Sequence, residues 1–311
     1  MAHAHRIGAD ENGLGARLGP LVVTAVLARV TDQGHRLLER RPPKRLRDDL
    51  GDSKELVSHK DFALGEAWAR AVVGNEARTP DEVFARLTLE TVPDLQAPCP
   101  NHVRGQCWSV DGEAFVAERG MVERLEGHLA HWATRGIEVL EVRSSVLCVK
   151  RLNEARDVGH SRFVADLHAM ERLVLALRER AAGDVLAVCG KVGGMGDYSR
   201  FFGPLSMRLH SVLASGRARS EYHFPGLGEV HFVRDVDSRD QLVMLASMVG
   251  KYVRELLMSR VSAFYTDGGD ESAKPSGYHD PVTAHFVRAT ALARRRRKVP
   301  DRCFERARDE L

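Results

Sequence analysis

The sequence has few cysteines, no internal repeat and no long apolar run, and each scarcity excludes a class of protein. Five cysteines among 311 residues are few and odd in number, which argues against a disulfide-stapled secreted scaffold. No apolar segment reaches the length of a membrane span, and the N-terminus lacks the apolar run of a signal peptide. We therefore expect a monomeric, cytoplasmic protein without a membrane partner.

Neither sign of charge is in large excess, since 46 Lys and Arg stand against 43 Asp and Glu, for a formal net charge of +3. This balance does not demand a nucleic-acid partner, but the positive charge is unevenly distributed. Basic runs lie at residues 40–47 and 294–298, and such runs are more often solvated faces or tails than phosphate contacts. The remaining composition, 43% hydrophobic and 29% charged, is typical of a globular chain with its own core.

The stretch at residues 7–27 reads as a β-hairpin, because an apolar entry and the run LVVTAVL flank a glycine-rich turn. Asp10 and Glu11 end the first strand beside Gly13 and Gly15. Adjacent carboxylates next to a turn that lets backbone approach a ligand suit metal and phosphate chemistry. The alternative interpretation is an acidic surface turn.

Strand-like and helix-like segments alternate along the chain, which indicates an α/β fold with a mixed sheet flanked by helices. We divide it into a domain at residues 1–265 with an inserted helical and loop module at 78–135, a linker at 266–277 and a C-terminal helical extension at 278–311. The patterns predict further elements, namely strands at 35–40, 184–192 and 222–237, a strand pair at 136–149, and helices at 52–73, 150–183 and 238–265.

A second set of carboxylates follows a late predicted strand, where Asp235 and Asp237 alternate and would point to one side. Carboxylates that converge from distant positions, here Asp10, Glu11 and Asp237, need a compensating cation. Hard oxygen ligands favour Mg²⁺ or Mn²⁺, and a pair of such ions can cleave a phosphodiester. Lys54, at the mouth of a predicted helix, is either a phosphate contact or an ordinary exposed lysine.

Three soft ligands lie close together in the loop-rich part of the insertion. Cys99, His102 and Cys107 form the pattern C-x2-H-x4-C, which could hold Zn²⁺ with a fourth ligand such as His128 or His131. The spacing matches no standard zinc finger, so the alternative is a pair of buried or free thiols.

Five motifs in order resemble those of type 2 ribonucleases H. The opening DENGLGARLGP is similar to the family's Asp-Glu-Ala-Gly-Arg-Gly followed by Gly-Pro, and GDSKEL to its Asp-Ser-Lys-Lys-Leu. RLNEA, the late DVDSRDQLVMLASMVGKYVREL and SGYHDPVTAH resemble three further family motifs. The resemblance covers most of the chain outside residues 78–135.

The resemblance implies an RNase H-like fold that cleaves RNA in RNA–DNA hybrids, or at embedded ribonucleotides, with two Mg²⁺ or Mn²⁺ ions. It makes Asp10, Glu11 and Asp237 the metal ligands and catalytic carboxylates, with Asp235 as the rival in register. It also implies a set of nucleic-acid contacts, with the tyrosine at the sugar, the glycine backbone at the 2′-hydroxyl and the lysines near phosphates or bracing the acidic cluster: Gly13, Leu14, Gly15, Lys54, Lys251 and Tyr278.

Two departures from the family pattern bear on activity. Cys189 stands at the family's third carboxylate, with Lys191 nearby to repel a cation and Asp197 as a substitute from the next loop. Leu14 replaces the arginine of the glycine turn. The sequence therefore supports two main hypotheses, an active endonuclease or a degenerate relative that binds hybrid nucleic acid or a protein partner. A zinc-dependent binding module is the third.

Overall fold

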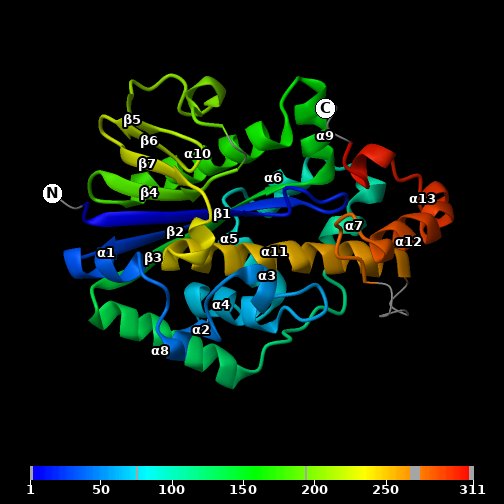
Figure 1. The fold of residues 1–311 in the computed structure, drawn as a ribbon. Helices are drawn as coiled ribbons and strands as arrows, with labels where there is room; N and C mark the ends of the chain where they lie inside the picture. Colours follow the sequence, from blue (N-terminus) through cyan, green and yellow to red (C-terminus); the bar gives the residue numbers. More distant parts are fainter. Residues whose placement is uncertain (1–2, 75, 193–194, 267–273, 308–311) are drawn as a thin grey trace.

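The computed structural model describes residues 3–74, 76–192, 195–266 and 274–307 (Figure 1). Its centre is a seven-stranded sheet in the order β3-β2-β1-β4-β7-β6-β5. Strands β1 and β4 run parallel, as do β4 and β7, and the other neighbours are antiparallel. This confirms the predicted mixed sheet. The strands are β1 (His5–Asn12), β2 (Leu21–Val30), β3 (Ile137–Leu147), β4 (Val185–Gly190), β5 (Ser211–Ser215), β6 (Arg219–Phe224) and β7 (Gly228–Val233).

The predicted hairpin at residues 7–27 is confirmed as β1 and β2, which pair antiparallel with Asp10 opposite Thr24. Nearly every residue of the run LVVTAVLARV is buried. A strand of continuous apolar residues is stable where both faces of the sheet are covered, and here helices lie on both. Helix α10 (Arg162–Arg180) packs on one face and α11 (Gln241–Thr266) on the other.

Helix α11 is the longest element, at 26 residues, and it is buried on all sides over its first five turns. It lies between β1 and β2 on one side and α4 on the other. The other helical segments are α1 (Asp32–Leu38), α2 (Lys44–Arg47), α3 (Ser53–Leu56), α4 (Ala63–Val73), α5 (Pro80–Leu87), α6 (Val92–Gln96), η1 (Asn101–Val103), α7 (Gly105–Trp108), α8 (Arg119–Thr134), α9 (Val149–Asp157), η2 (Ser199–Phe201), η3 (Val236–Ser238), α12 (Pro281–Ala289), α13 (Ala291–Arg296) and η5 (Asp301–Cys303).

The segment at residues 78–135 is helical, as predicted, and shares the main core on the α11 face. Phe84 and Trp132 belong to the same buried cluster as Trp68 of α4 and Tyr252 of α11. The buried carboxylate of Glu66 also accepts hydrogen bonds from two backbone N–H groups of the segment, at residues 116 and 117. The segment is therefore joined to the sheet through a common core.

The C-terminal extension is also helical, and it packs against the last turns of α11. Phe286 and Phe304 form an apolar cluster with Met258 and Leu18. Residues 267–273 of the predicted linker lie outside the described residues. No helix within the described ranges has the length and apolarity needed to cross a bilayer.

Two predicted elements are wrong for reasons of local chemistry. The strand expected at 35–40 is helix α1, because the Thr31 side chain accepts a hydrogen bond from Gly34 N and starts a helix. The strand expected at 222–237 is the hairpin of β6 and β7, whose turn uses positive φ angles at Gly226 and Gly228.

Three other predicted elements are divided or joined differently in the structure. The helix expected at 150–183 divides into α9 and α10, because Gly159 adopts a φ of 86° and Ser161 caps the second helix. The pair expected at 136–149 is the single long strand β3. The helix expected at 52–73 divides into α3, capped by Asp52, and α4.

Candidate functional site

Asp10 and Glu11 lie at the C-terminal end of β1, beside the end of β4. Ala9 pairs with Cys189, and both face the core under α10, so Asp10 and Gly190 face the α11 side. A Cβ built on Gly190 would lie 2.6 Å from Asp10 Oδ1 and 3.3 Å from Glu11 Oε2. Both carboxylates therefore converge over a position where only glycine leaves space.

Asp237 approaches the same place from η3, with Lys54 beside it. Lys54 Nζ lies 3.8 Å from Asp237 Oδ2. The charge of Asp237 helps to raise the pKa of both Asp10 and Glu11, whereas Lys54 lowers that of Glu11. The acids near the start of the chain and this late aspartate are thus brought into one cluster.

Asp166 of α10 is a fourth carboxylate of this cluster, and the sequence analysis missed it. Its side chain is 2% exposed, and Oδ1 has no hydrogen-bond partner within the described residues. Its charge is the second cause, after burial, of the raised pKa of Glu11. A signal was available, because Asp166 lies between Phe163 and Met170 on the core-facing stripe of its helix, where a carboxylate is out of place.

Burial is the main reason that these carboxyl groups resist ionisation. It raises the pKa of Asp10 and Asp166 well above the usual range, and mutual repulsion adds to the effect. Burial and the nearby Asp166 raise the pKa of Glu11 to about 8. The acidic cluster, which we define as Asp10, Glu11, Asp166 and Asp237, therefore holds its full negative charge only when a cation compensates it.

The acidic cluster suits a hard divalent cation in its donor chemistry. It offers carboxylate oxygens, among them an unpartnered buried oxygen of Asp166, and the oxygens of Asp10 and Glu11 both approach Gly190. As the side chains stand, no three His, Cys, Asp or Glu groups in the described ranges are arranged to hold one ion together. The fit is therefore one of donor type and of an unpartnered buried oxygen, without a coordination shell formed among the described residues.

Cys189, at the family's third carboxylate position, is fully buried in the core under α10. Burial raises the pKa of its thiol, so the side chain stays neutral. Lys191 points elsewhere than expected, because its ammonium donates a hydrogen bond to Ser220 Oγ and lies 4.5 Å from the centre of the Tyr198 ring. The thiol and this lysine belong to the packing around the acidic cluster.

The expectation that Asp197 replaces the missing carboxylate is wrong. One of its carboxylate oxygens accepts hydrogen bonds from Ser199 N, Ser199 Oγ and Tyr222 OH. These bonds lower the pKa of Asp197 and tie the carboxylate to its own loop. Asp166 is the carboxylate that comes to the cluster instead.

Asp235, the register rival of Asp237, points to solvent. It adopts a left-handed backbone conformation with a φ of 55°, its side chain is 72% exposed, and it pairs with Arg234 at 3.4 Å. The two aspartates lie beyond the end of β7 at Val233, so the expected strand alternation that would point both to one side is wrong.

The glycine loop after β1 docks onto the segment that carries Tyr278. Gly13 adopts a φ of 89°, and a Cβ there would lie 2.5 Å from Arg254 Nε. The guanidinium of Arg254 lies 4.7 Å from the centre of the Tyr278 ring and donates to Ser276 O. Gly15 is exposed, with open space where a side chain would be. The Gly15 backbone and Tyr278 are therefore held on one support.

Arg306, from the far end of the chain, fixes the glycine loop from inside. It donates to Gly13 O at 2.6 Å and to Gly19 O at 2.9 Å. Leu14 packs on Leu21 and Leu152, which explains an apolar side chain where the family pattern has arginine. Neither Arg306 nor Arg254 was singled out from the sequence.

Lys251 braces this support from α11. Its side chain is 11% exposed, and its ammonium lies 3.2 Å from Glu255 Oε1 and 5.8 Å from the centre of the Tyr278 ring. Lys54, by contrast, keeps 77% of its side chain exposed. Of the two lysines, Lys54 is free to approach a phosphate.

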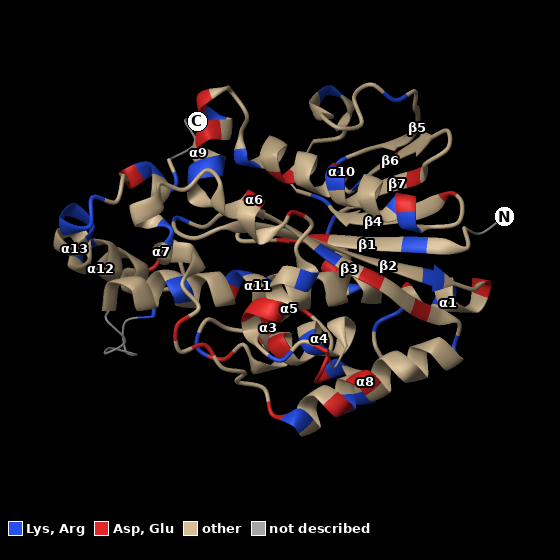
Figure 2. Cartoon of the chain, turned by 180° about the vertical axis from the view of Figure 1, so that it is seen from behind, with Lys and Arg blue, Asp and Glu red and all other residues tan. Residues whose placement is uncertain are grey.

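The C-terminal basic run gathers on and just after α13, at one end of the molecule (Figure 2). Two of its arginines lie over aromatic rings, Arg294 over Phe304 at 3.9 Å and Arg297 over Phe264 at 4.4 Å. Part of this run therefore serves to pack the C-terminal helices.

The structure does not assemble the predicted zinc ligands. Cys99 Sγ accepts a hydrogen bond from Trp108 Nε1 at 3.4 Å, and burial raises the pKa of the Cys107 thiol. His102 Nε2 contacts Lys298 O at 3.0 Å. The side chains fill local packing and hydrogen-bonding roles.

The two expected fourth zinc ligands are engaged elsewhere. His128 Nε2 lies 2.9 Å from Asp49 Oδ2, and His131 accepts a hydrogen bond from Arg45. No metal-holding group of three such side chains occurs in the part of the chain that the structure describes. The alternative interpretation, a pair of free thiols in packed surroundings, is the better description.

Comparison with protein-family models and with curated proteins finds no match to this sequence. Among solved structures, the chain is similar to an RNase HII from Archaeoglobus fulgidus solved as a complex with PCNA, with 16% identity, a TM-score of 0.41 and coverage of 98% of this chain and 95% of that one. It is similar to ribonuclease H2 from Pyrococcus horikoshii, with 15% identity, a TM-score of 0.43 and coverage of 96% and 92%.

A Bst-RNase HIII solved with Mn²⁺ is also similar, with 14% identity and a TM-score of 0.39, over 84% of this chain and 55% of that one. These proteins bear the names of the ribonuclease H group that the sequence motifs resemble. At such identities and TM-scores the likeness assigns no residue, substrate or activity to this chain.

Proposed function

We propose that the chain is a metal-dependent endonuclease, similar to type 2 ribonucleases H, that cleaves RNA in RNA–DNA hybrids. The observation that carries the proposal is the meeting of Asp10 and Glu11 over Gly190, with Asp166 of α10 and Asp237 of η3 close enough for their charges to raise the pKa of these carboxyl groups. Buried acids of this kind are costly to keep together without a function that uses them, and perturbed pKa values gather at functional sites.

Asp10, Glu11, Asp166 and Asp237 would hold the divalent cations, with Asp166 in place of the carboxylate that Cys189 lacks. Bound Mg²⁺ or Mn²⁺ would supply activation of water and stabilisation of the leaving oxygen at a phosphodiester. Lys54, exposed and next to Asp237, is suited to hold a substrate phosphate at the edge of the cluster.

The support formed by the glycine loop and Tyr278 would hold the nucleic acid. The exposed backbone of Gly15 can approach a ribose hydroxyl, and the Tyr278 ring, backed by Arg254, offers a flat face to a sugar or base. A site that senses the 2′-hydroxyl next to carboxylates that bind metal is the arrangement required to cut at a ribonucleotide.

The experiment incubates the protein with Mg²⁺ or Mn²⁺ and either a long RNA–DNA hybrid or a DNA duplex with one embedded ribonucleotide. We expect cleavage on the RNA-containing strand that disappears in Asp10→Asn and in excess EDTA. Cleavage that survives Asp10→Asn would show a contaminating nuclease. The absence of cleavage on both substrates with either ion would contradict the proposal.

A second function is supported by two observations. No three ligands among the described residues are arranged around one ion position, and the thiol at Cys189 is neutral. Under this alternative, the chain binds hybrid nucleic acid without cutting it. The same substrates distinguish the two functions, because tight binding to the hybrid without product in either metal supports the alternative. Binding to neither substrate contradicts both.

A further inference from the structure

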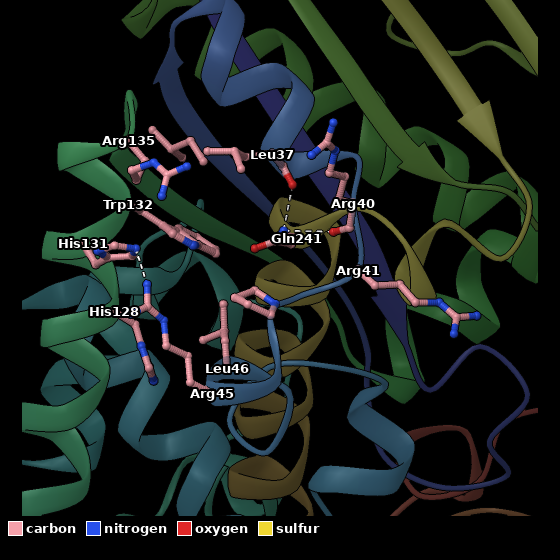
Figure 3. A pocket seen from close by; sticks show the side chains of 12 residues that line it. Leu37, Arg40, Arg41, Arg45, Leu46, His128, His131, Trp132, Arg135 and Gln241 are labelled. Atoms are coloured by element: carbon pink, nitrogen blue, oxygen red, sulfur yellow. Dashed lines mark hydrogen bonds between the residues drawn. The ribbon is translucent and has the colours of Figure 1, made fainter.

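A cavity of about 350 Å³ lies between α1, α2 and α8, at the start of α11 (Figure 3). Its size falls in the range of small-molecule sites. It takes in part of the basic run at 40–47, which the proposed function does not use. The lining comprises Leu37, Arg40, Arg41, Pro43, Arg45, Leu46, His128, His131, Trp132, Arg135, Ile137 and Gln241.

The floor of this cavity is apolar and fixed. Trp132, Ile137 and Leu46 are each at most 5% exposed. The Gln241 side chain donates hydrogen bonds to Leu37 O at 2.8 Å and Arg40 O at 2.9 Å (Figure 3). These bonds hold the start of the basic run at 40–47 against α11. The bottom of the cavity is therefore apolar and packed in place, and these side chains reach it with a small part of their surface.

The rim is cationic, and Asp49, which pairs with the lining residue His128, is also paired with Arg124. Arg45 and Arg135 flank His131 on the α8 side, and Arg40 lies across the cavity (Figure 3). No Asp or Glu lines the cavity, and within the described residues Arg40 and Arg135 form no ion pair. Like charges gathered at one rim repel each other, so an anion at this position would relieve a standing cost.

The neutral ring of His131 adds one N–H donor to the rim, at Nδ1. Arg45 donates to its Nε2, so Nε2 accepts and the ring proton is on Nδ1. Burial and the neighbouring Arg45 and Arg135 lower the pKa of His131, which keeps the ring neutral. The rim thus combines fixed guanidinium charges with a neutral imidazole.

We infer that this cavity is a nucleotide-binding site, with a base or its sugar on the Trp132 floor and a phosphate between Arg45 and Arg135. Guanidinium groups match phosphate oxygens in two-point hydrogen bonds, and the apolar floor distinguishes a nucleotide from a bare anion. The nucleotide is either free or the end of a strand. The inference does not depend on the proposed nuclease activity, because none of these residues belongs to the acidic cluster.

The test is titration calorimetry in EDTA, which removes metal binding from the measurement. The probes are adenosine 5′-monophosphate, a 5′-phosphorylated single-stranded DNA decamer and inorganic phosphate. The variant is Arg45→Gln/Arg135→Gln. The matched control, Arg208→Gln/Arg217→Gln, removes the same charge from exposed arginines near β5 and β6.

We expect the monophosphate to bind the wild type and the control alike, and the pocket variant at least about tenfold more weakly. Equal binding to all three proteins, or binding to none, would overturn the inference. Inorganic phosphate that binds as tightly as the nucleotide would overturn the role of the floor. A decamer that binds about tenfold tighter than the monophosphate, with the same loss in the variant, would assign the site to a strand end.

Discussion

The sequence suggested two sets of metal ligands, the carboxylates of Asp10, Glu11 and Asp237 and the group of Cys99, His102 and Cys107. The structure adds Asp166 to the first set and gives the members of the second set other partners. The acidic cluster gathers side chains separated by up to 227 positions, and one of its buried oxygens remains unpartnered. Cys99, His102 and Cys107 are close in sequence, yet each is engaged by its surroundings. Short spacing along the chain therefore says less about a site than the meeting of strand ends in a sheet.

The largest expected effect separates the two aspartates after β7. Asp237→Asn should lower the rate of hybrid cleavage by roughly a thousandfold, because the removed charge lies among the metal-binding carboxylates. Asp235→Asn should leave the rate within about twofold, because that side chain is 72% exposed and paired with Arg234. Single-turnover cleavage of one ribonucleotide-containing duplex measures both. Equal losses would remove the distinction between the clustered and the solvated aspartate.

Placing a carboxylate at position 189, as in the family pattern, should not increase cleavage. Cys189→Asp puts a second acid into the core under α10, next to Asp166, where the thiol is now neutral and packed. We expect a loss of about 3 kcal/mol in the free energy of unfolding, with no gain in cleavage. Urea denaturation, with Cys189→Ser as the uncharged polar control, measures the loss. Increased cleavage in the aspartate variant would mean that the strand end, rather than α10, supplies the third ligand.

Glu171, a buried acid outside the acidic cluster, should make the stability of the protein depend on pH. Burial raises the pKa of Glu171 to about 7, although its carboxylate accepts hydrogen bonds from Gly203 N and Leu205 N. The folded state keeps a proton that the unfolded chain loses near pH 4.5, so this stabilisation is full below pH 4.5 and disappears as the pH rises through about 7. Urea denaturation from pH 4 to 9 should show a shallower fall for Glu171→Gln. If the free energy of unfolding falls equally steeply with pH in both proteins, Glu171 is not a source of the pH dependence.

Asp166 should bind metal at the expense of stability. Asp166→Asn should weaken Mn²⁺ binding by about ten- to a hundredfold and raise the melting temperature of the metal-free protein by a few degrees, because a buried, unpaired acid is removed. Calorimetry at pH 8 and thermal unfolding in EDTA provide the two readouts. Glu171→Gln, from the same helix, is the control for binding. Unchanged Mn²⁺ affinity would leave Asp166 as a packing defect only.

The smallest expected effect is at the cysteines. Cys99→Ser/His102→Ala should leave the metal content of the purified protein unchanged. It should change the free energy of unfolding by no more than about 1 kcal/mol, because each side chain makes a single local hydrogen bond. Elemental analysis checks the first point. One equivalent of zinc in the wild type that is lost in the variant would reverse the comparison between the two groups.

The hairpin of β1 and β2, the apolar strand β4 and the long helix α11 could be predicted, because their hydrophobic patterns are continuous and their ends carry turn or cap residues. Asp10, Glu11 and Asp237 could be selected because the first two lie near the end of one strand and the third follows another. Asp166 could not be placed by motif, since its role depends on how α10 packs across β1. Arg254 and Arg306 act through the glycine loop, and no local pattern links positions so far apart.

The most direct test of the acidic cluster is a crystal structure with Mn²⁺, in which anomalous scattering locates the ion. We expect Mn²⁺ bound by Asp10 and Glu11 above Gly190, with an oxygen of Asp166 or Asp237 as a further ligand. A structure at saturating Mn²⁺ with no ion at this position, or with the ion held only elsewhere, would contradict the account.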